Sequence, residues 1–167
     1  VSGTAPVAVP LSIEGGLGLD HLVVTGTPTA VVDEVIYQVG PSPERGRLTY
    51  EDAANATLMS IEFSGFEPVH DYIPADLTVL GNNANNAINY GVGPNSLVAN
   101  LQNPGGVETG LISVDAFETI EFGNKIDVTI DGQAGDDDVN VADASNPGAS
   151  GARTIVGDGP VSGDDVQ

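Results

Sequence analysis

Short segments in which every second residue is apolar recur along the whole chain. Such alternation places the apolar side chains on one face of a β-strand, and no segment sustains the 3.6-residue period of a helix. Gly, Asn, Asp and Pro separate the segments, as expected for turns. The pattern predicts an all-β fold with strands at 22–24, 35–37, 48–50, 61–63, 77–79, 88–90, 112–114, 120–122, 128–130 and 139–141. The least strand-like segment, 50–60, is where a helical turn or short helix is expected.

Two parts of the chain repeat the same pattern. Residues 59–90 align with residues 110–141 at an offset of 51, without a gap, and their apolar positions and turn glycines stay in phase. The matched pairs include Ile61 with Ile112, Phe66 with Phe117, Glu67 with Glu118, Asp76 with Asp127, Leu77 with Val128, Gly81 with Gly132 and Ile88 with Val139. Internal repeats of this length are typical of proteins built from stacked units.

Weaker copies flank these two. Residues 20–37 echo the order Asp, strand, turn, Asp or Asn, strand that is found in 76–90 and 127–141, and residues 155–167 resemble 13–24. We therefore expect an N-terminal extended segment, 1–12, followed by one repeat-built β domain, 13–167. The approximate repeats are 13–58, 59–109 and 110–154, with another beginning at 155–167.

Two all-β architectures fit short strands at this spacing. Stacked coils place like residues above like, so the in-phase repeat, the 5% aromatic content and the Asn-rich turn GNNANN (81–86) favour a parallel β-solenoid, or β-helix, of degenerate repeats. The alternative is an arrangement of antiparallel β-sandwich domains.

The charge of the chain limits the classes of partner that it can bind. There are 24 acidic residues and four basic ones, for a net charge of −20. No basic surface can form for nucleic acid, and anionic membrane surfaces are disfavoured as well. No apolar run reaches the length of about 18 residues that a membrane span needs, so no membrane insertion is expected. The charge is compatible with divalent cations or cationic surfaces as partners, or with a high-salt medium.

One stretch, GGLGLDHLV (15–23), fits a known calcium-binding nonapeptide at every fixed position: Gly15, Gly16, Gly18, Asp20 and Leu22. It resembles the repeat of RTX (hemolysin-type) proteins, and the resemblance implies a Ca²⁺-binding turn with Asp20 as carboxylate and Leu22 in the core. GQAGDDDVN (132–140) is a near match. The RTX family needs tandem nonapeptides, however, and here the matches stand alone.

The densest acidic cluster is DGQAGDDD (131–138). Carboxylate and carbonyl oxygens suit Ca²⁺ better than zinc or copper. The candidate ligands are therefore Asp131, Asp136, Asp137 and Asp138, together with Asp20. The competing interpretation, at both places, is a glycine turn whose aspartates are solvated.

Catalytic motifs are missing from the sequence. The two histidines lack the spacing of a zinc site, and neither a nucleophile elbow nor a P-loop is found. The strand–turn–strand phrase is also similar to repeat regions of very large bacterial surface proteins. We expect a non-catalytic structural or adhesive repeat segment of a secreted or cell-surface protein, stabilised by Ca²⁺ and contacting neighbouring repeats. The alternatives are a self-assembling subunit of an extracellular filament or surface layer, and a carbohydrate-binding or carbohydrate-active all-β module.

Overall fold

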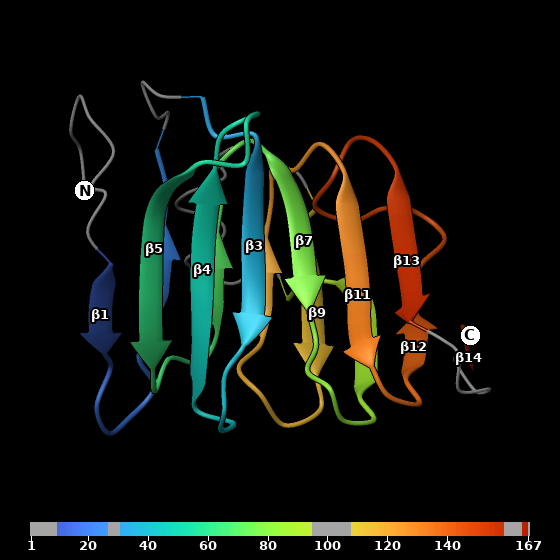
Figure 1. Cartoon of the computed structure of the whole chain (residues 1–167), viewed down its shortest axis with the longest axis horizontal. Coiled ribbons are helices and arrows are strands. Elements are labelled where there is room, and N and C mark those ends of the chain that lie inside the picture. The colour runs from blue at the N-terminus through green and yellow to red at the C-terminus, as the bar shows by residue number, and fades with distance from the viewer. Residues whose placement is uncertain (1–9, 27–30, 95–107, 159–164, 167) are drawn as a thin grey trace.

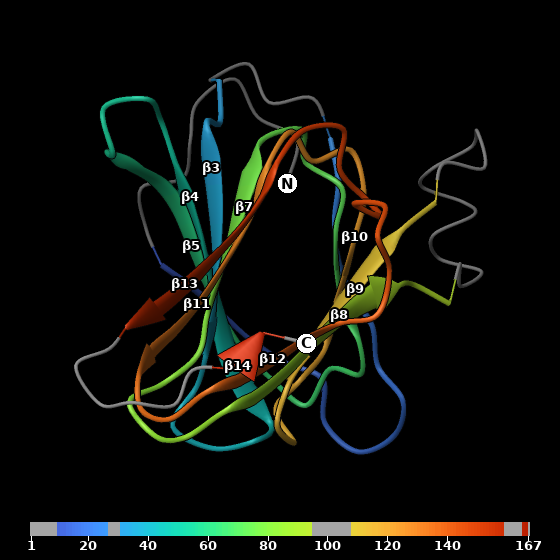
Figure 2. The same cartoon turned by 90° about the vertical axis from the view of Figure 1, so that its right-hand side faces the viewer.

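The chain folds into two mixed β-sheets that face each other (Figures 1 and 2). The computed structural model describes residues 10–26, 31–94, 108–158 and 165–166. Within these residues there is no helix, so none that could cross a membrane, and the all-β prediction is confirmed.

Within the part of the chain that the structure describes, each sheet has seven strands. In spatial order, sheet A contains β1 (Leu11–Glu14), β5 (Thr57–Ser64), β4 (Arg45–Glu51), β3 (Glu34–Val39), β7 (Asp76–Leu80), β11 (Val128–Ala134) and β13 (Arg153–Asp158). Sheet B contains, in spatial order, β2 (Leu22–Val24), β6 (Val69–Asp71), β10 (Ile120–Phe122), β9 (Gly110–Val114), β8 (Ala87–Val92), β12 (Asp138–Val141) and β14 (Asp165–Val166).

All ten segments predicted from alternation lie in strands. The expected helix at 50–60 is wrong, because residues 52–56 form the turn of the β4–β5 hairpin. There the Asp52 carboxylate accepts the backbone N–H groups of Ala54 and Ala56 at 2.9 and 3.0 Å, and Asn55 has a left-handed φ of 59°. A side chain that binds nearby backbone in this way favours a turn over a helix.

The 51-residue repeat is present in space as parallel, in-register strand pairs. Residues 51 apart lie side by side in three places: Leu77 with Val128 (β7–β11), Ile88 with Val139 (β8–β12) and Val69 with Ile120 (β6–β10). The stacking is not complete. Ile61 and Ile112 align in sequence, but β5 belongs to sheet A and β9 to sheet B.

The N-terminal copy stacks differently from its sequence alignment. Leu22 lies beside Val69 rather than beside a residue of β7, and Val35 lies beside Leu77 rather than beside a residue of β8. Short alternating strands next to an aspartate look alike, so their pattern fixes which face is buried but not which strand is the neighbour.

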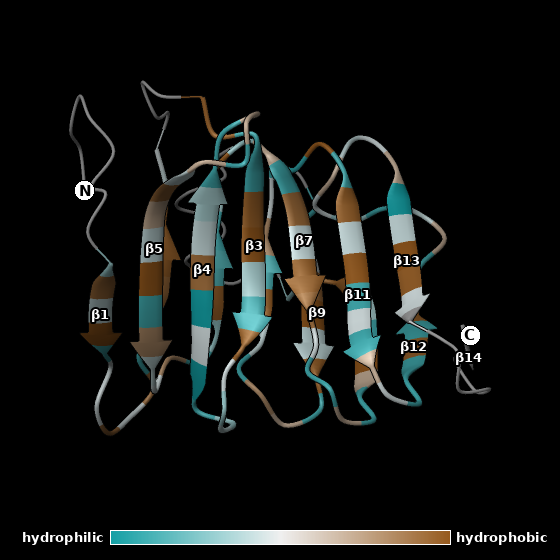
Figure 3. Cartoon of the chain, viewed as in Figure 1, coloured by the Kyte–Doolittle hydropathy of each residue, from teal (hydrophilic) through white to brown (hydrophobic). Residues whose placement is uncertain are grey.

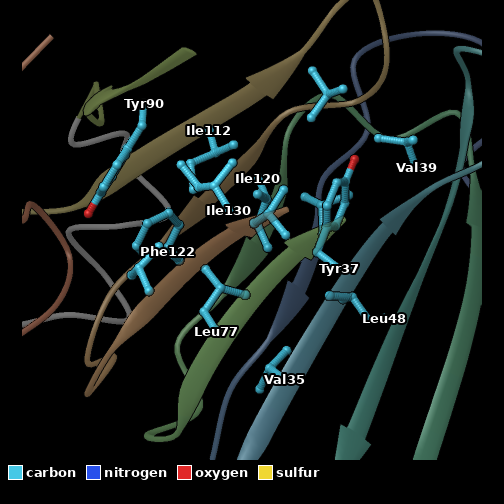
Figure 4. Close-up of a cluster of buried hydrophobic side chains, with 14 of the residues drawn as sticks. Val35, Tyr37, Val39, Leu48, Leu77, Tyr90, Ile112, Ile120, Phe122 and Ile130 are labelled. Atoms are coloured by element: carbon cyan, nitrogen blue, oxygen red, sulfur yellow. The ribbon is translucent and has the colours of Figure 1, made fainter. Parts of the chain in front are cut away.

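The core lies between the two sheets. Figure 3 shows apolar and polar bands alternating along the strands, and the apolar members point inward to give the cluster in Figure 4. All four tyrosines are buried. The Tyr90 hydroxyl, for example, donates to Asn146 Oδ1 at 2.6 Å and lies 2.7 Å from the Pro147 carbonyl oxygen. Hydrogen bonds of this kind allow a tyrosine to fill a core without an unsatisfied hydroxyl.

The two edge strands of each sheet run in the same direction. In sheet A, β1 is parallel to β5, and two antiparallel steps through β4 bring β3, β7, β11 and β13 back to that direction, as the arrows in Figure 1 show. The same holds in sheet B, where β2 and β14 are the edge strands. The two edges of each sheet are therefore related head to tail, as in an array of like units.

Candidate functional site: a buried charged network and the acidic turns

Strands β6 and β10 of sheet B are buried at every residue. Successive side chains of a strand point to opposite faces. Asp71 therefore shares the inward face with Val69, while His70 and its neighbour Glu121 share the outward face. Three charged or titratable side chains on two short strands are thus shielded from solvent on both sides of the sheet.

The inward group is an ion pair with two further partners. Lys125 Nζ contacts Asp71 Oδ1 and donates to the Ile73 carbonyl oxygen at 2.8 Å. Tyr50, from sheet A, donates to the other Asp71 oxygen at 2.6 Å. Burial, followed by the negative charge of Asp71 and the hydrogen bond to it, raises the pKa of Tyr50, so this hydroxyl keeps its proton. The group connects the two sheets.

The outward group is a row of hydrogen-bonding side chains that begins at the surface. His21 is exposed, and its Nδ1 lies 3.1 Å from Nε2 of the fully buried His70. His70 Nδ1 lies 3.3 Å from Glu121 Oε2, and Thr109 Oγ1 donates to Glu121 Oε1 at 2.8 Å. Tyr72 lies alongside, with its hydroxyl 3.4 Å from His70 Nδ1. The row links solvent to a buried carboxylate.

Three glutamates, Glu44, Glu67 and Glu118, lie close enough to interact in loops between strands. Burial, the charge of Glu67 and then that of Glu44 raise the pKa of Glu118 from 4.5 to about 7. Glu67 and Glu118 are the in-phase glutamates of the 51-residue repeat. The Tyr37 hydroxyl donates to the Glu118 carbonyl oxygen, which holds this residue at the edge of the core.

The predicted calcium ligands fall into two places. Asp131, Asp136, Asp137 and Asp138 lie at or beside the turn between β11 and β12, whereas Asp20 lies in the loop between β1 and β2. These elements are at opposite ends of the sheets. Asp20 therefore does not join the other four in one site. Leu22 is buried, as predicted for the last part of the nonapeptide.

The β11–β12 turn is bound to the equivalent turn one repeat earlier. The Asn86 N–H donates to Asp137 Oδ1 at 2.7 Å, the Asp136 N–H donates to Asn85 Oδ1 at 3.1 Å, and the Asp138 N–H donates to the Asn86 carbonyl oxygen at 2.8 Å. Asp131 Oδ1 accepts the Gln133 N–H at 2.8 Å. Asp137 is buried, and Asp136 and Asp138 are exposed. In the described ranges, no group of three or more His, Cys, Asp or Glu side chains is placed to hold a metal ion, and calcium binding stays a prediction.

Comparison with known proteins gives no relative for this fold and these groups. No protein-family model, no curated protein and no solved structure matches the chain.

Sequence reasoning missed the buried network. Its contacts His21–His70 and Asp71–Lys125 join residues 49 and 54 positions apart, and they form because β2, β6 and β10 lie side by side. One signal was present in the sequence: the separation of His21 and His70 is close to the repeat length.

Proposed function

We propose that this chain is a non-catalytic structural segment of a secreted or cell-surface protein, built from stacked repeats of the parallel β-solenoid type. The observation that carries the proposal is the set of hydrogen bonds between polar residues one repeat apart. Four such bonds link equivalent positions: Asp76 with Asp127, Asn85 with Asp136, Asn86 with Asp137 and Asn89 with Asn140.

Bonds between equivalent positions indicate that one repeat is the binding partner of the next. In stacked-repeat proteins each unit contacts its neighbours, and stability grows with the number of interfaces. Two independent sandwich domains would give each copy its own closed core, whereas here β7 and β11 share a sheet, as do β8 and β12. The strands β4 and β9 are then antiparallel insertions in an otherwise parallel stack.

The extracellular location rests on the resemblance to repeat regions of bacterial surface proteins. Antibody raised against the recombinant chain tests it. The expected result is labelling of intact, unpermeabilised source cells or of protein in their culture medium. Labelling that appears only after permeabilisation would contradict the proposed location.

Calcium as a stabiliser of the acidic turns is tested separately, by calorimetric titration of metal-stripped protein in moderate NaCl. Stoichiometric heat that is lost in Asp136→Asn with Asp138→Asn would assign the ion to the β11–β12 turn, and loss in Asp20→Asn would assign it to the nonapeptide. Absence of heat would remove calcium from the proposal and leave the stacked repeats.

Self-association into a filament is a second candidate function, because the two edge strands of each sheet run in the same direction. Within the described residues, β1 pairs only with β5 and β13 only with β11, so each has an edge that is not paired. Because β1 and β13 point the same way, copies joined end to end would continue both sheets in the parallel sense. Edge strands of this kind are templates for pairing with another chain.

Analytical ultracentrifugation over a range of NaCl concentrations tests the filament. Salt should promote association because it screens the net charge of −20 on each copy. Val156 is 39% exposed on β13, and Val156→Lys should reduce the association, whereas Val92→Lys, at an exposed position on β8, should not. A monomer at every salt concentration would exclude the filament and leave the structural segment intact.

A further inference from the structure

The chain contains two histidines, and the fold brings their ring nitrogens together. His21 Nδ1 and His70 Nε2 are 3.1 Å apart although 49 residues separate them in sequence. We propose that His21 and His70 bind a divalent first-row transition-metal ion, Cu²⁺ more tightly than Zn²⁺. Imidazole nitrogen suits both ions, and Cu²⁺ precedes Zn²⁺ in the general order of affinity.

The spacing of the two nitrogens fits a shared ion. Metal–imidazole bonds are about 2.0–2.1 Å long. Two nitrogens on one ion are therefore about 2.9 Å apart at a right angle and about 3.4 Å apart at a tetrahedral angle. The observed 3.1 Å lies between these values, and the ring planes are tilted by 40°. Binding would require the exposed His21 ring to turn so that both lone pairs meet at the ion.

The surroundings of His70 are those of a metal-binding histidine. Its second nitrogen, Nδ1, faces the Glu121 carboxylate at 3.3 Å, and Thr109 holds that carboxylate from the other side. A carboxylate on the far nitrogen of a histidine fixes the ring and selects the tautomer that leaves the near nitrogen with a lone pair. His70 and Glu121 are both fully buried, so this arrangement is rigid.

The ion can reach the site from solvent. His21 is exposed, so the ion arrives from solvent, and water completes its coordination. The acidic surface adds to this, because a net charge of −20 raises the local concentration of cations. Calcium is disfavoured at this position, since it prefers oxygen ligands.

The test is Cu²⁺ and Zn²⁺ titration of the full chain with its amino terminus blocked, followed by calorimetry and by electron paramagnetic resonance of the Cu²⁺ form. We expect one ion per chain and a resonance spectrum with two nitrogen ligands. The chain has no cysteine and no other imidazole that could give this result. In proton–nitrogen NMR spectra, Zn²⁺ should shift both histidine ring systems.

His21→Asn is the decisive variant. The asparagine amide can still donate to His70 Nε2, so the local hydrogen bond is kept, but an amide is a poor ligand for these ions. We expect affinity to fall at least about tenfold, and we expect Glu121→Gln, which changes a positioning residue, to lower it by about 10–100-fold while circular dichroism stays unchanged. The matched control, Asp136→Asn with Asp138→Asn, should leave affinity as in the wild type.

Two results would overturn the proposal. Cu²⁺ affinity that is equal in His21→Asn and the wild type, or that is lost in the Asp136 and Asp138 control, would mean that carboxylates hold the ion. No binding by the wild type at sub-millimolar metal would leave the contact between His21 and His70 as a hydrogen bond only.

Discussion

Lys125, in the loop between β10 and β11, forms an ion pair with Asp71 of β6, and neither side chain has any exposed surface. The chain has only four basic residues among 24 acidic ones, and it uses one of them here. Removal of one partner from such a pair leaves the other charge in a medium where it cannot be solvated, which is more costly than the loss of the contact itself.

Lys125→Met should therefore lower the free energy of unfolding by about 3–5 kcal/mol. Urea denaturation, followed by circular dichroism, measures this. Arg47→Met is the matched control, because Arg47 pairs with Glu62 at 3.2 Å while both side chains are about half exposed. Its expected cost is at most about 1 kcal/mol. Equal effects of the two substitutions would mean that the buried pair is solvated in solution.

Glu118 should make stability depend on pH. Its pKa is raised from 4.5 to about 7, so the folded state holds the proton more tightly than the unfolded chain does. The stability that this group contributes is present below about pH 4.5 and is lost as the pH rises to about 7. Glu118→Gln should therefore stabilise the protein more at pH 8 than at pH 4. The expected difference in the free energy of unfolding is about 1–2 kcal/mol once solvent screening is allowed for.

Parallel urea titrations of the wild type and Glu118→Gln at the two pH values check this dependence. Glu67→Gln should give a smaller change of the same sign, because it removes one of the two charges that oppose ionisation of Glu118. An effect of Glu118→Gln that is the same at pH 4 and pH 8 would show that this carboxyl titrates normally.

Gly135 should be far less tolerant of substitution than Gly16. Both have left-handed φ values, 149° and 96°, so alanine is strained at either position. A Cβ at Gly135 would also lie 2.5 Å from the Ala84 carbonyl oxygen of the previous turn, whereas a Cβ at Gly16 meets nothing within 4 Å. We expect Gly16→Ala to cost about 1 kcal/mol and Gly135→Ala about 2 kcal/mol or more, measured by thermal and urea unfolding. Equal costs would argue against tight stacking of the two turns.

Asp137 should matter as a hydrogen-bond acceptor rather than as a charge. Its Oδ1 accepts the Asn86 N–H at 2.7 Å, and the residue is 2% exposed. Asp137→Ala leaves a buried donor without that acceptor and should cost about 1–3 kcal/mol, while Asp137→Asn should cost less because the amide oxygen can still accept. Asp136→Ala, which removes an exposed side chain, should change stability by no more than about 0.5 kcal/mol. A similar loss in Asp136→Ala and Asp137→Ala would contradict the assigned role.

The sequence was informative where apolar alternation is strong. Val128, Ile130 and Val139 identify strands because nothing else buries every second residue. Strand β6 was missed because two of its three residues are His70 and Asp71, which are typical of a loop until their buried partners are known. Strands β1, β13 and β14 were not predicted as strands either. β1 and β13 cross the repeat boundaries expected after residues 12 and 154, and β14 lies in the range of the beginning repeat.

The repeat pattern did not predict correctly which strands are neighbours in the N-terminal copy. The offset of 51 gave three correct pairings, but the N-terminal copy was aligned one strand out of place, and this concealed the meeting of β2 with β6. The contact between His21 and His70 depends on that meeting. The candidate metal site could therefore not be found from residue types, whereas the acidic turn at 131–138 could.

The parallel pairing of β7 with β11 has a kinetic consequence. The two strands join across about fifty residues of intervening chain, so their contact closes a long loop before any hydrogen bond forms. The antiparallel meanders β3–β4–β5 and β8–β9–β10 are more local and should form earlier, with β11 and β13 added afterwards. Folding should then be slow, and substitutions in β4 should mainly retard it, while those in β13 should mainly accelerate unfolding.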